Sequence, residues 1–127
     1  MTAYLDTHVA AWLYAGRLDL FPQPVLDRLD EDDLAVSPMV ALEMEYLFER
    51  GKVREDSPPV LDALRRDLGV RLCDLGFDRV AEVAGQLRFT RDPFDRLIAA
   101  HARAGGGELV TKDLKLRQHC NWALWSD

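Results

Sequence analysis

The sequence predicts an α/β fold, a three-layer α/β/α sandwich with a central, mainly parallel sheet of four to five strands. Short apolar runs recur along the 127 residues, and each is followed by a segment whose apolar residues have helical spacing. Ser-Pro or Asp-Pro pairs precede several of these segments and glycines follow them, which is typical of helix starts and ends. Strands that alternate with helices favour a parallel sheet covered on both faces.

The first half of the chain is expected to open with a strand and a helix separated by Asp6. The predicted elements are a strand at residues 4–5, a helix over 8–14, a helix over 24–29, a strand at 34–36 and a helix over 38–50. Ser37 is the predicted N-cap of the last helix and Pro38 its first residue. A serine hydroxyl accepts a first-turn N–H, and proline has no N–H to leave unpaired.

The second half repeats the alternation. The predicted elements are a helix over 60–68, a strand at 70–73, a helix over 77–87, a helix over 93–102, a strand at 108–111, a short helix over 113–118 and an edge strand at 123–125. A Ser-Pro pair at 57–58 and an Asp-Pro pair at 92–93 give the start signals. We expect one domain over residues 1–127, because a chain of this length holds one core.

The composition is that of an ordinary globular protein, with 48% hydrophobic and 30% charged residues. No apolar run approaches the roughly 20 residues needed to span a bilayer. Asp6 interrupts the only early apolar segment, so a signal peptide is not expected and the cytoplasm is the expected location. Cys73 and Cys120 lack the spacing of a zinc or redox motif and are expected to be reduced, packed thiols.

Four acidic residues lie at the edge of apolar segments or inside them: Asp6, Glu43, Asp95 and Asp113. Asp6 and Asp113 follow predicted strands, where ligands bind in parallel sheets, and Asp95 lies in the first turn of a predicted helix. These three could also serve as helix caps, since the helix dipole favours a carboxylate there. Asp92 is a better cap than Asp95 for the helix that begins at residue 93.

Glu43 is the acid that a structural role explains least. Its neighbours one helical turn away are all apolar: Met39, Val40, Tyr46 and Leu47. By contrast, Glu45 and Glu49 form a separate polar stripe suited to solvent. A desolvated carboxylate without a partner is costly, so a cation or an arginine is expected to meet Glu43.

Carboxylates from separate segments favour a hard divalent cation, Mg²⁺ or Mn²⁺, which prefers oxygen ligands. Zinc is disfavoured, because the three histidines show no metal-binding spacing. The net charge of −6 is unfavourable for binding nucleic acid, although a bound cation reverses the local potential. Basic residues also lie beside two of the acids, with Arg91 and Arg96 near Asp95 and Lys112 next to Asp113.

The order of these motifs resembles that of the PIN-domain ribonucleases, and most closely the VapC toxins of type II toxin–antitoxin systems. The matching segments are Tyr-Leu-Asp-Thr-His at 4–8, Ser37 with Glu43 six residues later, Asp-Pro-Phe-Asp-Arg-Leu-Ile at 92–98 and Val-Thr-Lys-Asp at 110–113. The resemblance spans nearly the whole chain. It implies a PIN-like sandwich and hydrolysis of RNA by a water that Mg²⁺ or Mn²⁺ activates.

The resemblance also implies roles for individual residues. It places a metal-binding catalytic pocket at Asp6, Glu43, Asp95 and Asp113, with Asp92 as an outer member. Thr7 and Thr111 would orient carboxylates or waters beside that pocket. We expect Arg96 to lock a neighbouring carboxylate, and Arg91 and Lys112 to contact the RNA backbone.

The partners that the resemblance implies are an RNA substrate, a second copy of the chain in a homodimer, and a small VapB-like antitoxin that covers the active site. Two other functions compete with this one. A receiver-like signalling module also gathers acids around Mg²⁺, but this sequence lacks its adjacent acids and its Lys-Pro step. A PIN-like protein that binds RNA or a partner without cutting is disfavoured by the complete set of four acids.

Overall fold

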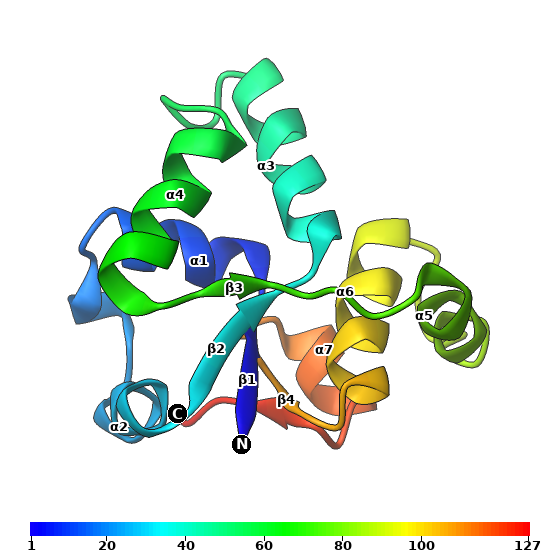
Figure 1. Ribbon diagram of the computed structural model, residues 1–127. Helices are drawn as coiled ribbons and strands as arrows, with labels where there is room; N and C mark the ends of the chain where they lie inside the picture. Colours follow the sequence, from blue (N-terminus) through cyan, green and yellow to red (C-terminus); the bar gives the residue numbers. More distant parts are fainter.

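The computed structural model describes residues 1–127 (Figure 1). The chain forms β1 (Thr2–Leu5), α1 (Thr7–Tyr14), the 3₁₀ helix η1 (Leu18–Leu20), α2 (Gln23–Glu31), β2 (Asp33–Val36) and α3 (Pro38–Glu49). It continues with α4 (Ser57–Leu68), β3 (Arg71–Leu72), α5 (Phe77–Ala84), α6 (Pro93–Ala104), β4 (Glu108–Val110), α7 (Leu114–His119) and β5 (Ala123–Leu124). Every predicted strand and helix is present with its ends shifted by a few residues, and η1 is the one element that the sequence pattern did not indicate.

The five strands form one sheet in the order β3-β2-β1-β4-β5, and every neighbouring pair is parallel. The predicted α/β fold is therefore confirmed, and the sheet is entirely rather than mainly parallel. Tyr4 in the central strand pairs with Ala35 on one side and Leu109 on the other. The receiver-like alternative is wrong, because receiver-type folds have the strand order 2-1-3-4-5.

The chain reverses its direction of travel across the sheet between β1 and β4. From β1 it moves outward through β2 to β3, then crosses back and moves outward through β4 to β5. Since such crossovers are right-handed, the connecting helices must lie on opposite faces. Figure 1 shows α1, α2 and α4 on one side of the sheet and α5, α6 and α7 on the other. The carboxyl ends of β1 and β4 thus form the switch point where ligands bind in this class of fold.

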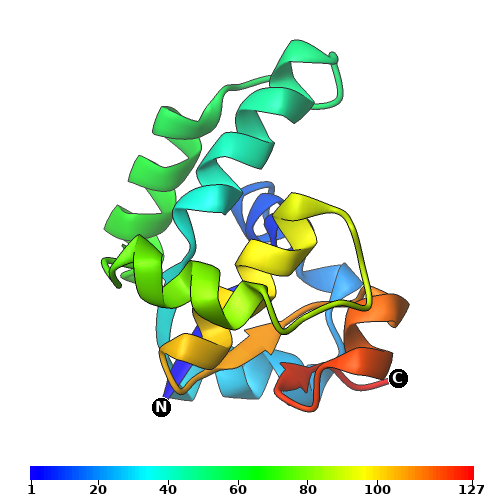
Figure 2. The ribbon, with the colours of Figure 1, turned by 90° about the vertical axis from the view of Figure 1, so that its right-hand side faces the viewer.

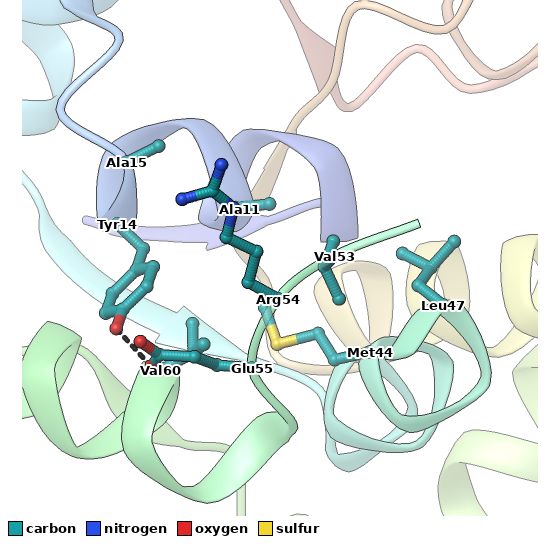
Figure 3. Close-up of a pocket in the computed structure, with 9 residues that line it drawn as sticks. All are labelled: Ala11, Tyr14, Ala15, Met44, Leu47, Val53, Arg54, Glu55 and Val60. Carbon is teal, nitrogen blue, oxygen red and sulfur yellow. Dashed lines mark hydrogen bonds between the residues drawn. The ribbon is translucent and has the colours of Figure 1, made fainter. Parts of the chain in front are cut away.

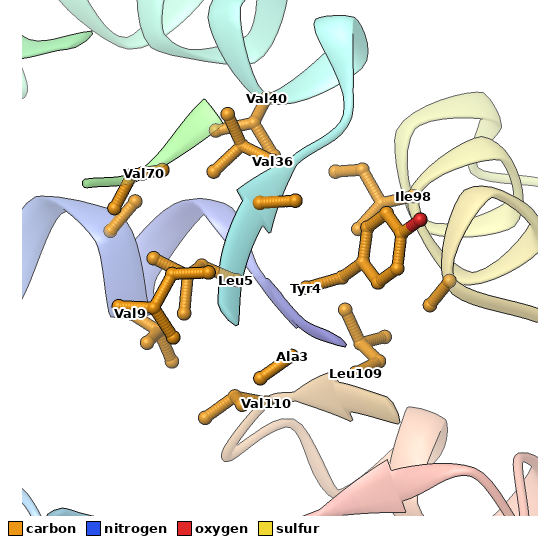
Figure 4. Packing of buried hydrophobic residues seen from close by; sticks show 14 of the residues in the cluster. Ala3, Tyr4, Leu5, Val9, Val36, Val40, Val70, Ile98, Leu109 and Val110 are labelled. Carbon is orange, nitrogen blue, oxygen red and sulfur yellow. The ribbon is translucent and has the colours of Figure 1, made fainter. Parts of the chain in front are cut away.

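The central strand is buried on both faces, which explains why it is a continuous apolar run rather than an alternating one. Ala3, Tyr4 and Leu5 are each at most 3% exposed. In Figure 4 the Leu5 side chain lies beside Val9, whereas Tyr4 points the opposite way, toward Ile98. The core therefore fixes β1 between two helical layers, and with it the residue that follows β1, Asp6.

A glycine turn lets β4 begin beside β1. Gly106 has a φ of +70°, in the left-handed region that favours glycine. A Cβ on Gly107 would lie 2.4 Å from the Thr2 carbonyl oxygen, so a side chain cannot be accommodated there. The run of glycines after α6 thus has a structural cause.

The start of α4 differs from the prediction. Asp56, not Ser57, is the N-cap residue, and the first helical residue is Ser57. The Ser57 N–H donates to a carboxylate oxygen of Glu45 at 2.5 Å, so Glu45 links α3 to α4 instead of facing solvent. Cys73 and Cys120 are buried and unpaired, as predicted. None of the helices combines the length and the hydropathy needed to cross a bilayer.

Candidate active site

Asp6 lies at the carboxyl end of β1 with both carboxylate oxygens hydrogen-bonded. Its Oδ1 accepts from the Thr7 N–H at 2.8 Å, and its Oδ2 accepts from the Thr111 hydroxyl at 2.6 Å. The residue is 7% exposed, and its burial raises the pKa of the carboxyl despite both hydrogen bonds. The hydrogen bonds from Thr7 and Thr111 therefore fix the position of the carboxyl group, but neither donor carries a charge that could neutralise the carboxylate.

Glu43 reaches the same region from α3. The Thr7 hydroxyl donates to Glu43 Oε1 at 2.5 Å, so one threonine contacts Asp6 through its backbone and Glu43 through its side chain. The side chain is half-buried, and burial is the main cause of the raised pKa of its carboxyl. The arginine that could have met Glu43 is not there, since no ion pair includes this residue.

Thr111 connects Asp6 to the start of α7. Its Oγ1 donates to Asp6 and also accepts from the Asp113 N–H at 3.1 Å. Asp113 is the N-cap of α7, because its Oδ1 accepts from the Leu116 N–H at 2.9 Å. Asp113 can therefore cap the helix and also belong to a site at the strand end. Capping uses only Oδ1, and the other carboxylate oxygen of this exposed residue makes no hydrogen bond.

Asp92 is the N-cap of α6, as the Asp-Pro signal predicted. Its Oδ1 accepts from the Phe94 N–H at 2.9 Å and from the Asp95 N–H at 3.4 Å. Asp95 follows in the first turn of the helix, half-buried, and has no side-chain hydrogen bond. Since Asp92 caps the helix, the Asp95 carboxylate is free for another ligand.

The electrostatics of Asp95 bring the acidic residues together as one group. Its pKa is raised to about 7, first by burial and then by the negative charges of Asp92, Asp6, Asp113 and Glu43. The causes of this shift are burial and nearby negative charges, and no basic side chain near Asp95 opposes them. The structure therefore brings Asp95 into the electrostatic neighbourhood of all four acids that sequence reasoning placed beside it.

Arg96 does not lock a carboxylate, contrary to our expectation. Its Nε and Nη2 donate to the Ala84 carbonyl oxygen at 3.2 and 2.8 Å. Ala84 is the last residue of α5, where helix carbonyls lack intrahelical partners and the negative end of the helix dipole attracts a cation. Arg96 thus ties α5 to α6. Arg91 and Lys112 are exposed and make no ion pair.

Sequence reasoning assigned no role in the site to His8. His8 is exposed on the first turn of α1, and its charge acts to lower the pKa of both Asp6 and Glu43. The sequence signal that could have indicated His8 is its position two residues after Asp6, where β1 ends and α1 begins.

The donor set fits a hard divalent cation by its chemistry. All the converging groups are carboxylate oxygens, none is paired with a lysine or arginine, and two threonine hydroxyls orient them. No three of the His, Cys, Asp or Glu side chains are close enough to form a preassembled metal cluster. The oxygen-only donors fit Mg²⁺ or Mn²⁺ and do not fit zinc.

A separate, mostly apolar pocket of about 280 Å³ lies between α1, α3, α4 and the loop that joins the last two (Figure 3). Its lining residues are Ala11, Tyr14, Ala15, Met44, Leu47, Val53, Arg54, Glu55 and Val60. The Tyr14 hydroxyl donates to Glu55 at its edge. None of the acids of the candidate site lines this pocket, so the pocket is separate from that site.

The chain resembles known proteins in sequence and in fold. The chain is 37% identical over 123 residues to ribonuclease VapC22 of Mycobacterium tuberculosis, covering 93% of this chain and 92% of that protein. Its fold is similar to that in VapBC2 from Rickettsia felis bound to a promoter DNA fragment, with a TM-score of 0.71, 22% identity and full coverage of both chains. VapBC-1 from nontypeable Haemophilus influenzae gives a TM-score of 0.67 with 20% identity, covering 100% of this chain and 98% of that chain. Residues 3–121 match the PIN domain, and the chain therefore belongs to the PIN-domain family.

Proposed function

We propose that this protein is a metal-dependent endoribonuclease and acts as the VapC-type toxin of a toxin–antitoxin pair. The observation that carries the proposal is that the Thr7 and Thr111 hydroxyls bond to Glu43 and Asp6 at the switch point of a parallel sheet, where burial and the charges of neighbouring acids raise the pKa of Asp95. Its similarity to ribonuclease VapC22 over nearly the whole chain supports RNA as the substrate.

The residues divide into two roles. Asp6, Glu43, Asp95 and Asp113 would hold Mg²⁺ or Mn²⁺, and Asp92, the N-cap of α6, would be an outer member of the same site. Thr7 and Thr111 orient Glu43 and Asp6 through the hydrogen bonds described above. When bound, the cation supplies a water of lowered pKa for in-line attack on phosphorus and neutralises charge on the phosphate.

Substrate binding would rely on basic side chains at the rim. Arg91 lies just before the α6 cap and Lys112 lies between Thr111 and Asp113; both are exposed and unpaired. Since the net charge of the chain is −6, such contacts and the cation must overcome a repulsive average potential. RNA affinity should therefore depend on the divalent cation as well as on these two residues.

The partner we propose is a VapB-like antitoxin. The solved structures that this chain resembles in fold are VapBC proteins. The apolar pocket of Figure 3 is a surface that such a partner could cover, because apolar side chains line most of it. A homodimer and a cytoplasmic location complete the proposal.

Incubation of the purified protein with RNA in Mg²⁺, in Mn²⁺ and in EDTA tests the proposal. We expect cleavage with either cation and none in EDTA. Asp6→Asn and Asp95→Asn should abolish cleavage while circular dichroism shows an intact fold. Cation-dependent RNA binding without cleavage would favour a non-catalytic PIN-like protein, and unchanged cleavage by either variant would refute the assigned site.

A further inference from the structure

The helices that carry Glu43 and Asp95 are joined by a buried hydrogen bond. The Ser37 hydroxyl lies 2.8 Å from Nδ1 of His101, and the two residues are 1% and 3% exposed. Ser37 caps the start of α3, and His101 lies in the second half of α6. A polar pair this deep has a defined geometry, because an unpaired polar atom there would be costly.

The neighbours of the ring determine which nitrogen carries the proton. Nδ1 also lies 3.0 Å from the Leu97 carbonyl oxygen, which can only accept a hydrogen bond. Nδ1 is therefore the protonated nitrogen, and its hydrogen is shared between the Leu97 carbonyl and the Ser37 hydroxyl oxygen. The Ser37 oxygen accepts from the Met39 N–H at 3.0 Å as well. The imidazole thus contacts the first turn of α3 through one specific atom.

A second contact joins the same helices at their other ends. The rings of Tyr46 and Phe94 meet edge to face, with centroids 5.2 Å apart and an interplanar angle of 81°. The helices α3 and α6 are antiparallel, because Ser37 lies opposite His101 and Tyr46 lies opposite Phe94. Figures 1 and 2 show the opposite directions of the two helices.

The two acids lie between these contacts and in the same register. Glu43 is six residues after Ser37, and Asp95 is six residues before His101. Because an α-helix rises 1.5 Å per residue, the Cα of each acid lies about 9 Å along its helix from the Ser37–His101 bond, and the antiparallel arrangement displaces both in the same direction. The bond is thus placed to set how closely Glu43 and Asp95 approach each other.

We infer that His101 is a positioning residue for the metal site: its Nδ1–H, bonded to Ser37, holds α3 against α6 at the separation that brings Glu43 and Asp95 to one cation. The inference rests on the proposed metal-dependent function, and it adds a residue that touches neither the substrate nor the cation. Carboxylate ligands must be held to within about 0.5 Å of their productive positions, so a small change in helix separation suffices to weaken the site.

Three substitutions and a matched control test the inference in the full chain. His101→Leu removes the ring nitrogens. His101→Asn places an amide N–H near the position of Nδ1, whereas His101→Gln places it near Nε2. Val25→Ala removes buried volume from α2, away from both helices, and controls for a general loss of stability. The measurements are the Glu43–Asp95 Cα separation in crystals, Mn²⁺ affinity by calorimetry, and kcat and KM for RNA.

We expect His101→Leu to change the Cα separation by more than about 0.5 Å. It should also weaken Mn²⁺ binding and lower kcat about 10- to 100-fold, with KM for RNA changed less than about twofold. His101→Asn should restore most of the loss, and His101→Gln should not. Val25→Ala should lower Tm and leave Mn²⁺ affinity unchanged.

A folded His101→Leu protein with the parent Cα separation and Mn²⁺ affinity would overturn the inference. If that variant does not fold, the Asn and Gln variants decide, because they have the same functional group at two positions; equal behaviour overturns the inference. If the parent protein neither binds Mn²⁺ nor cleaves RNA, the proposed function fails. The Cα separations would then still decide whether His101 sets the spacing of the two acids.

Discussion

Thr111 Oγ1 donates a hydrogen bond to Asp6 Oδ2 over 2.6 Å, although the two residues are 105 positions apart in the sequence. The pairing of β1 with β4 brings them together, since Leu5 and Val110 are partners in the sheet. The bond holds a buried carboxylate in one orientation at the switch point of the fold.

Removing that hydroxyl should impair catalysis without removing a ligand. We expect Thr111→Val to lower kcat/KM for RNA about 10- to 100-fold, the range typical of residues that orient metal ligands. Thr111→Ser keeps the hydroxyl and should retain most of the activity. The comparison uses steady-state cleavage of one RNA substrate in Mg²⁺. A Thr111→Val enzyme as active as the parent would show that the bond is only structural.

Glu43→Gln should remove the charge of Glu43 while preserving its shape and its ability to accept from Thr7. We expect a loss of cleavage of roughly 100-fold or more, because a metal ligand is worth several kcal/mol and each 1.36 kcal/mol is a factor of ten. Glu49→Gln on the exposed face of the same helix is the matched control and should behave like the parent protein. Equal activity of the two variants would contradict the assignment of Glu43.

The stability of the metal-free protein should fall as the pH rises. The pKa of Asp95 is about 7 in the folded protein, above its value in an unfolded chain of about 3.9. The neutral carboxyl is therefore favoured in the folded state, and its contribution to stability is complete below about pH 4 and is lost as the pH rises through 7. In EDTA, we expect a lower Tm at pH 8 than at pH 5 and a smaller difference in Asp95→Asn.

The same linkage predicts the effect of cations. Mg²⁺ or Mn²⁺ binds the ionised carboxylates, so either should raise Tm more at pH 8 than at pH 5. Differential scanning fluorimetry at pH 5 and pH 8, with and without MnCl₂, measures how Tm depends on pH in the Mn²⁺-bound and in the metal-free protein. An identical pH slope in the parent protein and in Asp95→Asn would show that Asp95 is not the group responsible.

Arg96 should matter for stability rather than for catalysis. Its guanidinium donates twice to the Ala84 carbonyl at the end of α5. We expect Arg96→Met to lower the free energy of unfolding by about 1–2 kcal/mol in urea titrations, the usual range for a hydrogen bond from a charged group. Cleavage by the folded variant should stay within about threefold of the parent. A large loss of cleavage with unchanged stability would restore the carboxylate-locking role.

Local signals in the sequence were sufficient for the elements. Pro38 after Ser37 and Pro93 after Asp92 marked helix starts, and the hydroxyl and carboxylate caps occur in the structure as expected. These signals act between residues that are neighbours in the chain, so composition and spacing reveal them. The role of Glu45 at the start of α4 was missed because its partner, Ser57, is twelve residues away and across a loop.

The candidate acids were also identifiable from sequence, since a carboxylate in an apolar segment conflicts with its surroundings wherever the chain folds. What only the tertiary structure decided was their partners. Thr7 rather than an arginine meets Glu43, Arg96 bonds to α5, and Ser37 reaches His101. The reason is physical: hydrogen bonds depend on distances of about 3 Å between groups that only the packing of helices on the sheet brings together. The sequence alone thus identified the candidate acids of the site, and the fold decided which side chains hold them in place.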